Sequence, residues 1–317
     1  MNIGFIDIVH PVLNKMLEEA GHKCQMLEKQ SREELKNLAG TLDGIVIRSR
    51  TRMDKDFLQH APHLKFIARS GAGMENIDLD YCNTRNIICF NSPEGNRDAV
   101  GEQAIGMLLM LFNHLKRADD EVRKGIWLRE ENRGEELAGK TVAIIGYGNM
   151  GSALGKKLQG FDCEILAYDK YKSNYGTTYA KESSWEEIYE KADVLSLHVP
   201  LTEETHYLLN AERIAKFKKP FYLINTARGQ NVKTDDLVAA LKQGKIKGVC
   251  LDVLEYEKSS FENLELDKLP EPMQYLVSAQ NVILSPHVGG WTHESYYKLS
   301  YYLGEKILKQ FGSVPGL

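Results

Sequence analysis

The sequence predicts an α/β fold of two domains, each built on a parallel β-sheet. The chain has 317 residues, a length that suggests about two domains. Short apolar runs alternate with helical stretches, which is typical of parallel strands covered by helices on both faces. A glycine-rich turn, GYGNMG at 146–151, stands in the second half of the chain, whereas the first half has the same alternation without such a turn.

The first half begins with an apolar run at 3–6, which predicts a buried strand. A helix is expected at 11–20, because Pro11 stands near its start, Gly21 follows its end and apolar residues repeat at helical spacing. Further short strands are predicted at 45–47, 64–68 and 87–90.

The segment 103–115 is nearly all apolar and is expected to be a helix. A helix that is apolar all round is buried, either in a core or between subunits. The following segment, 116–139, is polar and charged and contains Trp127. It is either a linker or an arm that reaches another subunit.

The second half continues the alternation of strands and helices. Its best-marked helix is expected at 235–243, with Thr234 as the N-cap and Gly244 behind the last turn. A long helix at about 292–311 closes the chain. Strands are predicted at 142–145, 165–168, 194–197, 222–224, 249–251 and 282–284.

The glycine-rich turn and an acid beyond it predict a dinucleotide site. Gly146 permits a tight turn, Gly148 lets the backbone approach a pyrophosphate, and Gly151 lets the helix pack close to its strand. The free N–H groups at the helix N-terminus favour an anion. Asp169 ends the next strand, where a carboxylate can bind the ribose hydroxyls of NAD and repels the extra phosphate of NADP. NAD is therefore the predicted cofactor.

Polar clusters follow the later strands, where open α/β sheets bind their ligands. Arg228, Glu257 and His287 stand out among them. An arginine can bind a carboxylate bidentately and polarise the C2 oxygen of a 2-oxo acid. A histidine can exchange the hydroxyl proton, and Glu257 would orient the imidazole and favour its protonated form. Taken singly, each could also be an ordinary surface or ion-pair residue.

The composition is that of an ordinary soluble globular protein, with 43% hydrophobic residues, 26% charged residues and a net charge of −4. No basic stripe with interleaved aromatics indicates a nucleic-acid partner. Five cysteines lie far apart without a C-x-x-C pair, which argues against a metal site or a disulfide framework. Neither a secretory signal nor a membrane span is expected. We therefore expect a cytoplasmic protein without metal or membrane partners.

Ordered motifs run along essentially the whole chain: RSRT (48–51), RSGAGMENID (69–78), FNSPEGNRDAVGE (90–102), TVAIIGYGNMG (141–151) with Asp169, HVPLT (198–202), INTARG (224–229), LDVLEYE (251–257) and SPHVGG (285–290). They resemble the D-isomer-specific 2-hydroxyacid dehydrogenases, and among these most closely the phosphoglycerate dehydrogenases. The resemblance implies two Rossmann-like domains. A flavodoxin-like substrate-binding domain would comprise 1–97 and 291–317, and an NAD-binding domain would comprise 98–290. It also implies that 103–140 forms a dimerisation helix and arm, so that a homodimer is expected.

The resemblance implies Arg228, Glu257 and His287 as the catalytic residues, and it adds contacts to the two ligands. The NAD contacts would be Gly146, Gly148, Asn149, Met150, Gly151, Asp169, His198, Val199, Pro200, Thr205, Thr226, Ala227, Arg228, Asp252, His287, Gly289 and Gly290. Asp252 would lie near the nicotinamide carboxamide, and an ordinary strand-end cap is the alternative. The substrate contacts would be Arg48, Arg69, Ser70, Gly71, Ala72, Gly73 and Asn76, with backbone N–H groups as a carboxylate cradle and the two arginines facing a substrate phosphate.

The sequence departs from the family pattern at several positions. Trp291 stands where a small residue is usual and could narrow the substrate pocket or pack at the domain hinge. Lys258 replaces a frequent proline, so the Glu257 loop could be set differently, and Gly101 replaces a usual alanine. Arg129 could add charge from a partner subunit. The C-terminal regulatory domain of longer phosphoglycerate dehydrogenases is not expected.

The resulting prediction is an NAD-dependent oxidoreductase that transfers hydride to or from C2 of a D-2-hydroxy acid. The leading substrate pair is 3-phosphoglycerate and 3-phosphohydroxypyruvate, which would place the enzyme in serine biosynthesis. One alternative is a glyoxylate or hydroxypyruvate reductase on the same scaffold. Another is a non-catalytic NAD-sensing binding protein. Fold alone does not decide between them.

Overall fold

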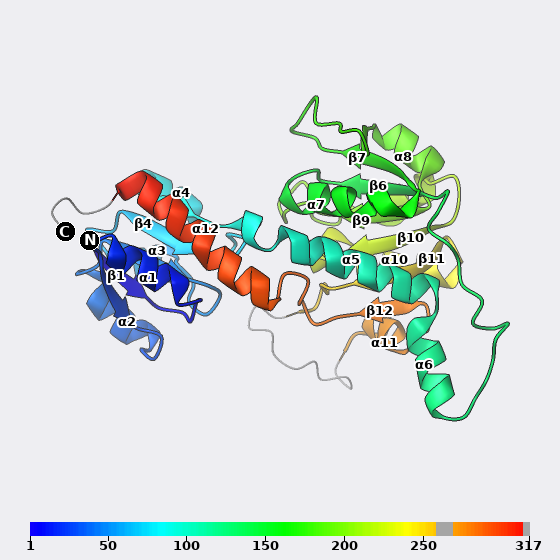
Figure 1. The fold of residues 1–317 in the computed structure, drawn as a ribbon, viewed down its shortest axis with the longest axis horizontal. Helices are drawn as coiled ribbons and strands as arrows, with labels where there is room; N and C mark the ends of the chain where they lie inside the picture. The colour runs from blue at the N-terminus through cyan, green and yellow to red at the C-terminus, as the bar shows by residue number, and fades with distance from the viewer. Residues whose placement is uncertain (258–268, 313–317) are drawn as a thin grey trace. The chain divides into compact units, whose positions relative to one another are not determined.

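The structure, a computed structural model, describes residues 1–257 and 269–312 of the chain. The chain forms two compact units (Figure 1). Unit 1 consists of Met1–Arg97 and Trp291–Leu317, and unit 2 of Asp98–Gly290. Each unit contains one parallel sheet, so the predicted α/β fold with two parallel sheets is confirmed.

The sheet of unit 1 has the strand order β2-β1-β3-β4-β5, and its pairings are parallel. The order reverses between β1 and β3, the point where sheets of this kind bind ligands at their carboxyl ends. The strands are β1 (Asn2–Phe5), β2 (Lys23–Met26), β3 (Gly44–Ile47), β4 (Phe66–Arg69) and β5 (Ile88–Phe90).

Helices cover both faces of this sheet. On one face, α1 (Val12–Glu19) and α12 (His293–Phe311) share a hydrophobic cluster with Phe5 and Phe66. The other face is covered by α2 (Arg32–Ala39), α3 (Lys55–Leu58) and α4 (Leu79–Thr84). Because α12 comes from the far end of the chain, the core of unit 1 combines N-terminal and C-terminal residues.

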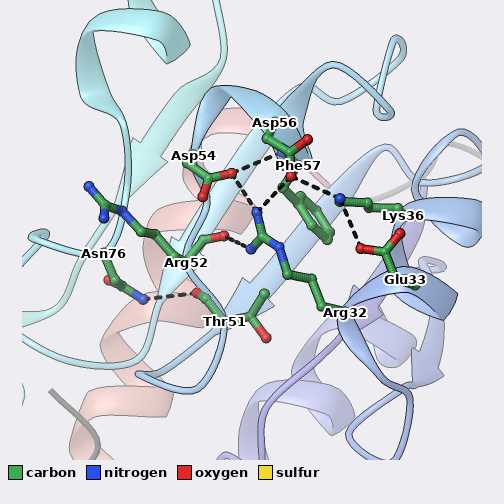
Figure 2. A network of polar contacts seen from close by, with 9 residues as sticks. All are labelled: Arg32, Glu33, Lys36, Thr51, Arg52, Asp54, Asp56, Phe57 and Asn76. Carbon is green, nitrogen blue, oxygen red and sulfur yellow. Dashed lines mark hydrogen bonds and ion pairs between the residues drawn. The ribbon is translucent and has the colours of Figure 1, made fainter.

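The loop after β3 is held by polar contacts from two sides (Figure 2). Arg32 donates from Nη1 to the Arg52 carbonyl at 2.6 Å and from Nη2 to Asp54 at 2.5 Å. On the other side, Asn76 donates from Nδ2 to the Thr51 carbonyl at 3.3 Å. Side chains of neighbouring segments therefore fix the backbone of this loop.

The sheet of unit 2 has the order β12-β11-β10-β9-β6-β7-β8, again with parallel pairings. Its order reverses between β6 and β9, so the loops after these two strands flank the expected ligand crevice. The strands are β6 (Thr141–Ile145), β7 (Glu164–Tyr168), β8 (Lys181–Glu182), β9 (Val194–Leu197), β10 (Phe221–Asn225), β11 (Ile246–Leu251) and β12 (Val282–Leu284).

Two groups of helices cover the two faces of this second sheet. On one face, α5 (Arg97–Phe112) and α7 (Asn149–Leu158) share a hydrophobic cluster. The other face is covered by α8 (Trp185–Lys191), α9 (Ala211–Lys216), α10 (Thr234–Lys242) and α11 (Glu271–Ser278). Short 3₁₀ turns stand at Pro93–Gly95, Gln159–Phe161 and Gly229–Asn231.

The apolar helix expected at 103–115 runs instead from Arg97 to Phe112, with part of its surface buried in the core. A Cβ at Gly101 would lie 3.3 Å from the backbone nitrogen of Leu154 in α7, so the glycine lets α5 and α7 approach closely. The next helix, α6 (Leu115–Arg123), lies in the segment expected to be a linker or arm. It projects from the body of unit 2 together with the segment after it.

The start of α10 differs from the prediction, because Thr234 is the first helical residue and not the N-cap. Lys233 precedes the helix without a side-chain cap. The Thr234 N–H group instead donates to the Glu255 carboxylate at 2.9 Å. A carboxylate from a distant segment replaces the local cap, and the local sequence cannot reveal this.

Within residues 1–257 and 269–312, no helix is both long and apolar enough to span a bilayer. These same residues contain no group of three or more His, Cys, Asp or Glu side chains that could hold a metal ion.

Candidate active site

The glycine-rich turn links β6 to α7. Gly146 has a φ angle of 88°, a left-handed conformation that favours glycine. A Cβ at Gly151 would lie 2.1 Å from the Gly146 carbonyl oxygen, so only glycine lets α7 start so close to the turn. Nothing lies within 4 Å of a Cβ at Gly148, which leaves its backbone open to a ligand. Asn149 and Met150 begin α7, where backbone N–H groups lack helical partners.

Two side-chain atoms next to β9 and β10 are buried without a hydrogen-bond partner, His198 Nδ1 and Thr226 Oγ1. The other ring nitrogen of His198, Nε2, lies 2.8 Å from Ser196 Oγ. Burial lowers the pKa of His198 to about 4, so its imidazole is neutral near pH 7. Buried polar atoms normally have partners, and polar groups of a bound dinucleotide could satisfy both. With the open backbone at Gly148, they fit the predicted NAD site.

Asp169 lies at the end of β7, next to the glycine-rich turn. Its Oδ2 accepts from the Tyr147 N–H group at 2.9 Å, and its Oδ1 accepts from the Tyr171 N–H group at 3.1 Å. Each carboxylate oxygen can accept a further hydrogen bond. The acid is therefore fixed beside the turn and retains capacity for the ribose hydroxyls of NAD.

Asp252 holds the loop between β12 and α12 through its carboxylate. Its Oδ1 accepts from Ser285 Oγ at 2.6 Å and from the Val288 N–H group at 2.9 Å, and its Oδ2 accepts from the Gly289 N–H group at 2.7 Å. The residue is only 2% exposed. Of the two roles expected for Asp252, these contacts resemble the strand-end cap, and they fix the loop that carries His287.

His287 and Glu257 form a hydrogen-bonded pair, with His287 Nδ1 3.0 Å from Glu257 Oε1. The His287 backbone has a φ angle of 54° and donates its N–H group to the Asp252 carbonyl at 2.8 Å. The two side chains are 30% and 27% exposed, so solutes can reach them. Because Nδ1 donates to the carboxylate, Nε2 is the ring atom through which a proton can be exchanged.

Glu257 stands at the end of a tight turn, 254–257, that a second carboxylate anchors. The Glu257 N–H group donates to the Leu254 carbonyl at 3.2 Å. Glu255 accepts from the Tyr207 hydroxyl at 2.6 Å and from the Thr234 N–H group at 2.9 Å. Glu255 therefore ties the turn that carries Glu257 to two neighbouring segments of unit 2.

Arg228 follows β10 on a loop fixed by two buried asparagines. Asn231 Oδ1 accepts from the Arg228 N–H group at 3.0 Å, and Asn225 Nδ2 donates to the Arg228 carbonyl at 2.9 Å. A Cβ at Gly229 would lie 2.0 Å from the backbone of the turn 254–257, so the two segments are in direct contact. The loop of Arg228 therefore packs against the turn that carries Glu257. The Glu257 side chain in turn bonds to His287.

Two of the predicted substrate residues in unit 1 bond to the backbone of the loops after β3 and β4. Arg69 donates from Nε to the Arg48 carbonyl at 3.0 Å and from Nη1 to the Gly73 carbonyl. Asn76 donates from Nδ2 to the Arg48 carbonyl at 3.1 Å. Both side chains therefore fix the backbone at Arg48, and Arg69 also shapes the loop that ends at Gly73.

The predicted carboxylate cradle, Ser70–Gly73, uses part of its donor capacity internally. The Ser70 N–H group donates to the Ile47 carbonyl at 2.9 Å, and that of Gly71 donates to the Arg69 carbonyl at 2.8 Å. Among the residues that the structure describes, the N–H groups of Ala72 and Gly73 have no acceptor. Of the predicted carboxylate cradle, the backbone N–H groups of Ala72 and Gly73 are therefore the donors left for a substrate carboxylate.

A family model for the NAD binding domain of D-isomer specific 2-hydroxyacid dehydrogenases matches residues 105–289, more than half of the chain. The chain belongs to this family. It is an NAD-dependent D-2-hydroxyacid dehydrogenase, and NAD is its cofactor.

Relatives of this dehydrogenase differ in substrate. A hydroxypyruvate reductase from Thermotoga maritima is 34% identical over 303 residues, which cover 95% of this chain and 94% of that protein. A D-3-phosphoglycerate dehydrogenase from Archaeoglobus fulgidus is 31% identical over 301 residues, which cover 94% of this chain but 55% of that longer protein. The structure of an Aquifex aeolicus D-lactate dehydrogenase complexed with NAD and lactic acid has a TM-score of 0.80 at 30% identity, covering 98% of this chain and 95% of the other.

Some residues that build the site of this dehydrogenase were not among the predicted ones. Glu255 lies within LDVLEYE, and Asn225 lies within INTARG, directly after a strand where asparagine often bonds to its own loop. The position of Asn225 directly after a strand is a signal that could have been recognised in the sequence. Five further residues lie in loops of unit 2, and their contacts with NAD remain predictions: Val199, Pro200, Thr205, Ala227 and Gly290. Lys258 lies outside the described residues, and so does its expected effect on the loop.

Proposed function

We propose that this dehydrogenase transfers hydride between NAD and C2 of a D-2-hydroxy acid with His287, Glu257 and Arg228 as its catalytic residues. The observation that carries the proposal is the hydrogen bond of 3.0 Å between His287 Nδ1 and Glu257 Oε1. The pair stands on loops after β11 and β12, in the same sheet as the glycine-rich turn. A proton-exchanging group and the predicted cofactor turn therefore belong to one unit.

The bound nicotinamide supplies the chemistry of hydride transfer, and the side chains act on the proton and the substrate. In reduction of a 2-oxo acid, protonated His287 donates its Nε2 proton to the keto oxygen. In oxidation, the neutral ring accepts the hydroxyl proton at the same atom. Glu257 fixes the ring orientation through its hydrogen bond to Nδ1. Arg228 binds the carboxylate and polarises the keto oxygen through its planar fork of N–H donors.

The leading substrate pair is 3-phosphoglycerate and 3-phosphohydroxypyruvate, which assigns the reaction to serine biosynthesis. The likeness to the phosphoglycerate dehydrogenase from Archaeoglobus fulgidus supports this choice. Arg48, directly after β3, supplies a cation at the carboxyl end of the unit 1 sheet. A phosphate attracts such a cation strongly, since charge-assisted hydrogen bonds to its oxygens are short and strong.

A hydroxypyruvate or glyoxylate reductase is the second candidate, and two observations favour it. The hydroxypyruvate reductase from Thermotoga maritima matches this chain along nearly the whole length of both proteins. Arg69, the second arginine expected at the phosphate, donates instead to the carbonyl groups of Arg48 and Gly73. An uncharged substituent at C3 needs no second cation.

A panel of 2-oxo acids with NADH and NADPH, followed at the nicotinamide absorbance, tests the proposal. We expect NADH to be preferred, and kcat/KM to be highest for 3-phosphohydroxypyruvate compared with hydroxypyruvate and glyoxylate. Arg48→Ala should then reduce kcat/KM for the phosphorylated acid far more than for the other two. A higher value for hydroxypyruvate or glyoxylate would establish the second candidate. NADH binding without turnover of any acid would contradict both and indicate an NAD-sensing protein.

We also propose that the protein is a homodimer that pairs through α5, α6 and the segment after them. Large apolar side chains lie exposed along this part of unit 2. They are Met110, Leu115, Val122, Ile126, Trp127 and Leu128. Several large exposed apolar side chains on one segment favour an interaction site there. Sedimentation equilibrium should give twice the chain mass, and Trp127→Glu should shift the protein towards monomer; a monomeric parent protein would refute the proposal.

A further inference from the structure

Arg48 is a partly buried cation directly after β3, at the carboxyl ends of the unit 1 strands and next to the point where the strand order reverses. Among the described residues, its guanidinium donates no hydrogen bond and forms no ion pair. Burial is the largest cause that lowers the pKa of Arg48, yet a guanidinium keeps its proton in proteins. A charge that is taken from water without a direct ion-pair partner is costly, so this position favours an anionic ligand.

The Asp7 carboxylate attracts the Arg48 guanidinium but forms no ion pair with it. Asp7 Oδ2 accepts from the backbone N–H groups of Arg48, at 2.5 Å, and of Arg50, at 3.4 Å. Its Oδ1 forms an ion pair with Arg50 Nε at 3.2 Å. Arg50 is further committed through Nη1, which donates to the Gln30 carbonyl at 2.9 Å. Asp7 therefore fixes the backbone of Arg48 and pairs with the side chain of Arg50.

The Arg48 guanidinium makes a cation–π contact with the indole ring of Trp291. The Arg48 Cζ atom lies 4.1 Å from the centroid of the Trp291 ring, which is a stacking distance. The indole is itself backed by Tyr296 of α12, with ring centroids 6.0 Å apart, and Tyr296 contacts His10 at 5.3 Å. An indole beneath a guanidinium covers one face of the cation and leaves its in-plane N–H donors for a ligand.

We propose that Trp291 is a positioning residue that holds Arg48 as the recognition group for a second anionic group of the substrate, either a phosphate or a carboxylate. This proposal rests on the proposed function, because it selects among 2-oxo acids. Arg50 is committed to Asp7 and the Gln30 carbonyl, and Arg69 to the carbonyl groups of Arg48 and Gly73, so we assign the recognition to Arg48. A single planar fork binds a carboxylate and a phosphate bidentately. Glyoxylate has no second anionic group and gains nothing from this contact.

The test compares Trp291→Ala and Trp291→Phe with the parent enzyme on 3-phosphohydroxypyruvate, 2-oxoglutarate and glyoxylate. Trp291→Ala should lower kcat/KM for whichever of the two acids with a second anionic group is used, about tenfold and mainly through KM. The same variant should change kcat/KM for glyoxylate less than about twofold. Trp291→Phe keeps an aromatic face and should retain most of the discrimination. The larger of the two losses tells whether the second group is phosphate or carboxylate.

Trp185→Ala is the matched control, because Trp185 lies under another arginine, with Arg213 Cζ 4.3 Å from its ring centroid in unit 2. This control should leave the ratio of kcat/KM values between acids unchanged. Equal losses on all three acids in Trp291→Ala, or no loss on any, would overturn the positioning role. If the parent enzyme turns over none of the acids, the proposed function fails on its own. Calorimetric titration with inorganic phosphate and malonate then decides the inference, which requires one of them to bind the parent chain and to bind Trp291→Ala about tenfold more weakly.

Discussion

The carboxyl edges of the two sheets use their basic side chains in different ways. In unit 2, burial lowers the pKa of His198 to about 4, and the imidazole gives up its charge. In unit 1, burial also lowers the pKa of Arg48, but a guanidinium stays charged and stacks on Trp291 instead. A titratable base can be buried neutral, whereas a permanent cation needs an anion or an aromatic face.

The acids at the two edges differ in the same sense. In unit 2, Glu257 bonds to His287 and forms a pair suited to proton exchange. In unit 1, Asp7 bonds to backbone N–H groups and forms an ion pair with Arg50, and among the described residues no acid forms an ion pair with Arg48. Under the proposed function, unit 2 would carry the proton-exchanging residues and unit 1 the cation that recognises the substrate.

The largest effect on stability is expected at the glycine turn of unit 2. Gly151→Ala should destabilise the protein by about 3 kcal/mol, because its Cβ would lie 2.1 Å from the Gly146 carbonyl oxygen. Gly71→Ala in unit 1 is the matched control, since its Cβ would meet only Arg69 side-chain atoms, at 3.4 Å or more. Denaturant unfolding measures both. If both substitutions destabilise the protein equally, the loss at Gly151 does not come from a clash with the Gly146 carbonyl oxygen, and the prediction is wrong.

Gly148→Ala separates folding from cofactor binding at the same turn. A Cβ there meets no atom within 4 Å, so the free energy of unfolding should stay within about 0.5 kcal/mol of the parent. The same methyl group would block the backbone that a pyrophosphate approaches, so NADH should bind at least about tenfold more weakly. If the affinity for NADH is unchanged, the pyrophosphate of the cofactor does not bind at this turn.

The neutral state of His198 predicts a pH dependence of stability. The unfolded chain binds this proton with a pKa of about 6.5, and the folded chain with a pKa of about 4. The unfolded state therefore takes up the proton first, so folded stability falls as pH decreases from about 6.5 to about 4, by up to about 3 kcal/mol. The stability advantage of the parent over His198→Asn should shrink by that amount across the window. Parallel pH curves would contradict the buried neutral ring.

A smaller effect is expected at Glu255, which anchors the turn that carries Glu257. Glu255→Ala should lower kcat about tenfold, since the His287–Glu257 pair loses its support, while the affinity for NADH stays the same. Glu255→Gln keeps an acceptor for the Thr234 N–H group and should recover most of the activity. Glu212→Ala, at an exposed position of α9, is the surface control. A similar kcat in all three variants would remove Glu255 from the positioning role.

Much of the fold was predictable because apolar strands and glycine turns leave local signals. The buried strands β3 and β9 read directly as apolar runs, and Gly146–Gly151 marked the turn from β6 to α7. The strand β2 was missed because polar Lys23 and Gln25 break up its apolar residues and none of its four residues is fully buried. The N-cap of α10 was assigned wrongly because its substitute, Glu255, is distant in sequence.

The candidate site was less predictable than the fold, because side-chain commitments depend on the folded neighbourhood. The sequence placed Arg48, Arg50 and Arg69 at strand ends, but could not show which guanidinium is occupied. The structure commits Arg69 to the carbonyl groups of Arg48 and Gly73, and Arg50 to Asp7. It also places Trp291, which was expected to narrow the substrate pocket or pack at the domain hinge, against Arg48.

The most direct test of the central claim is the turnover of His287→Ala together with its affinity for NADH. We expect kcat to fall by about two to four powers of ten, since general acid–base catalysis contributes that much, while NADH binds as it does to the parent. His287→Asn controls for the backbone φ angle of 54°, because asparagine tolerates this conformation, and it should be equally inactive. Near-normal turnover in either variant would contradict the assignment of His287 as the proton-exchanging group.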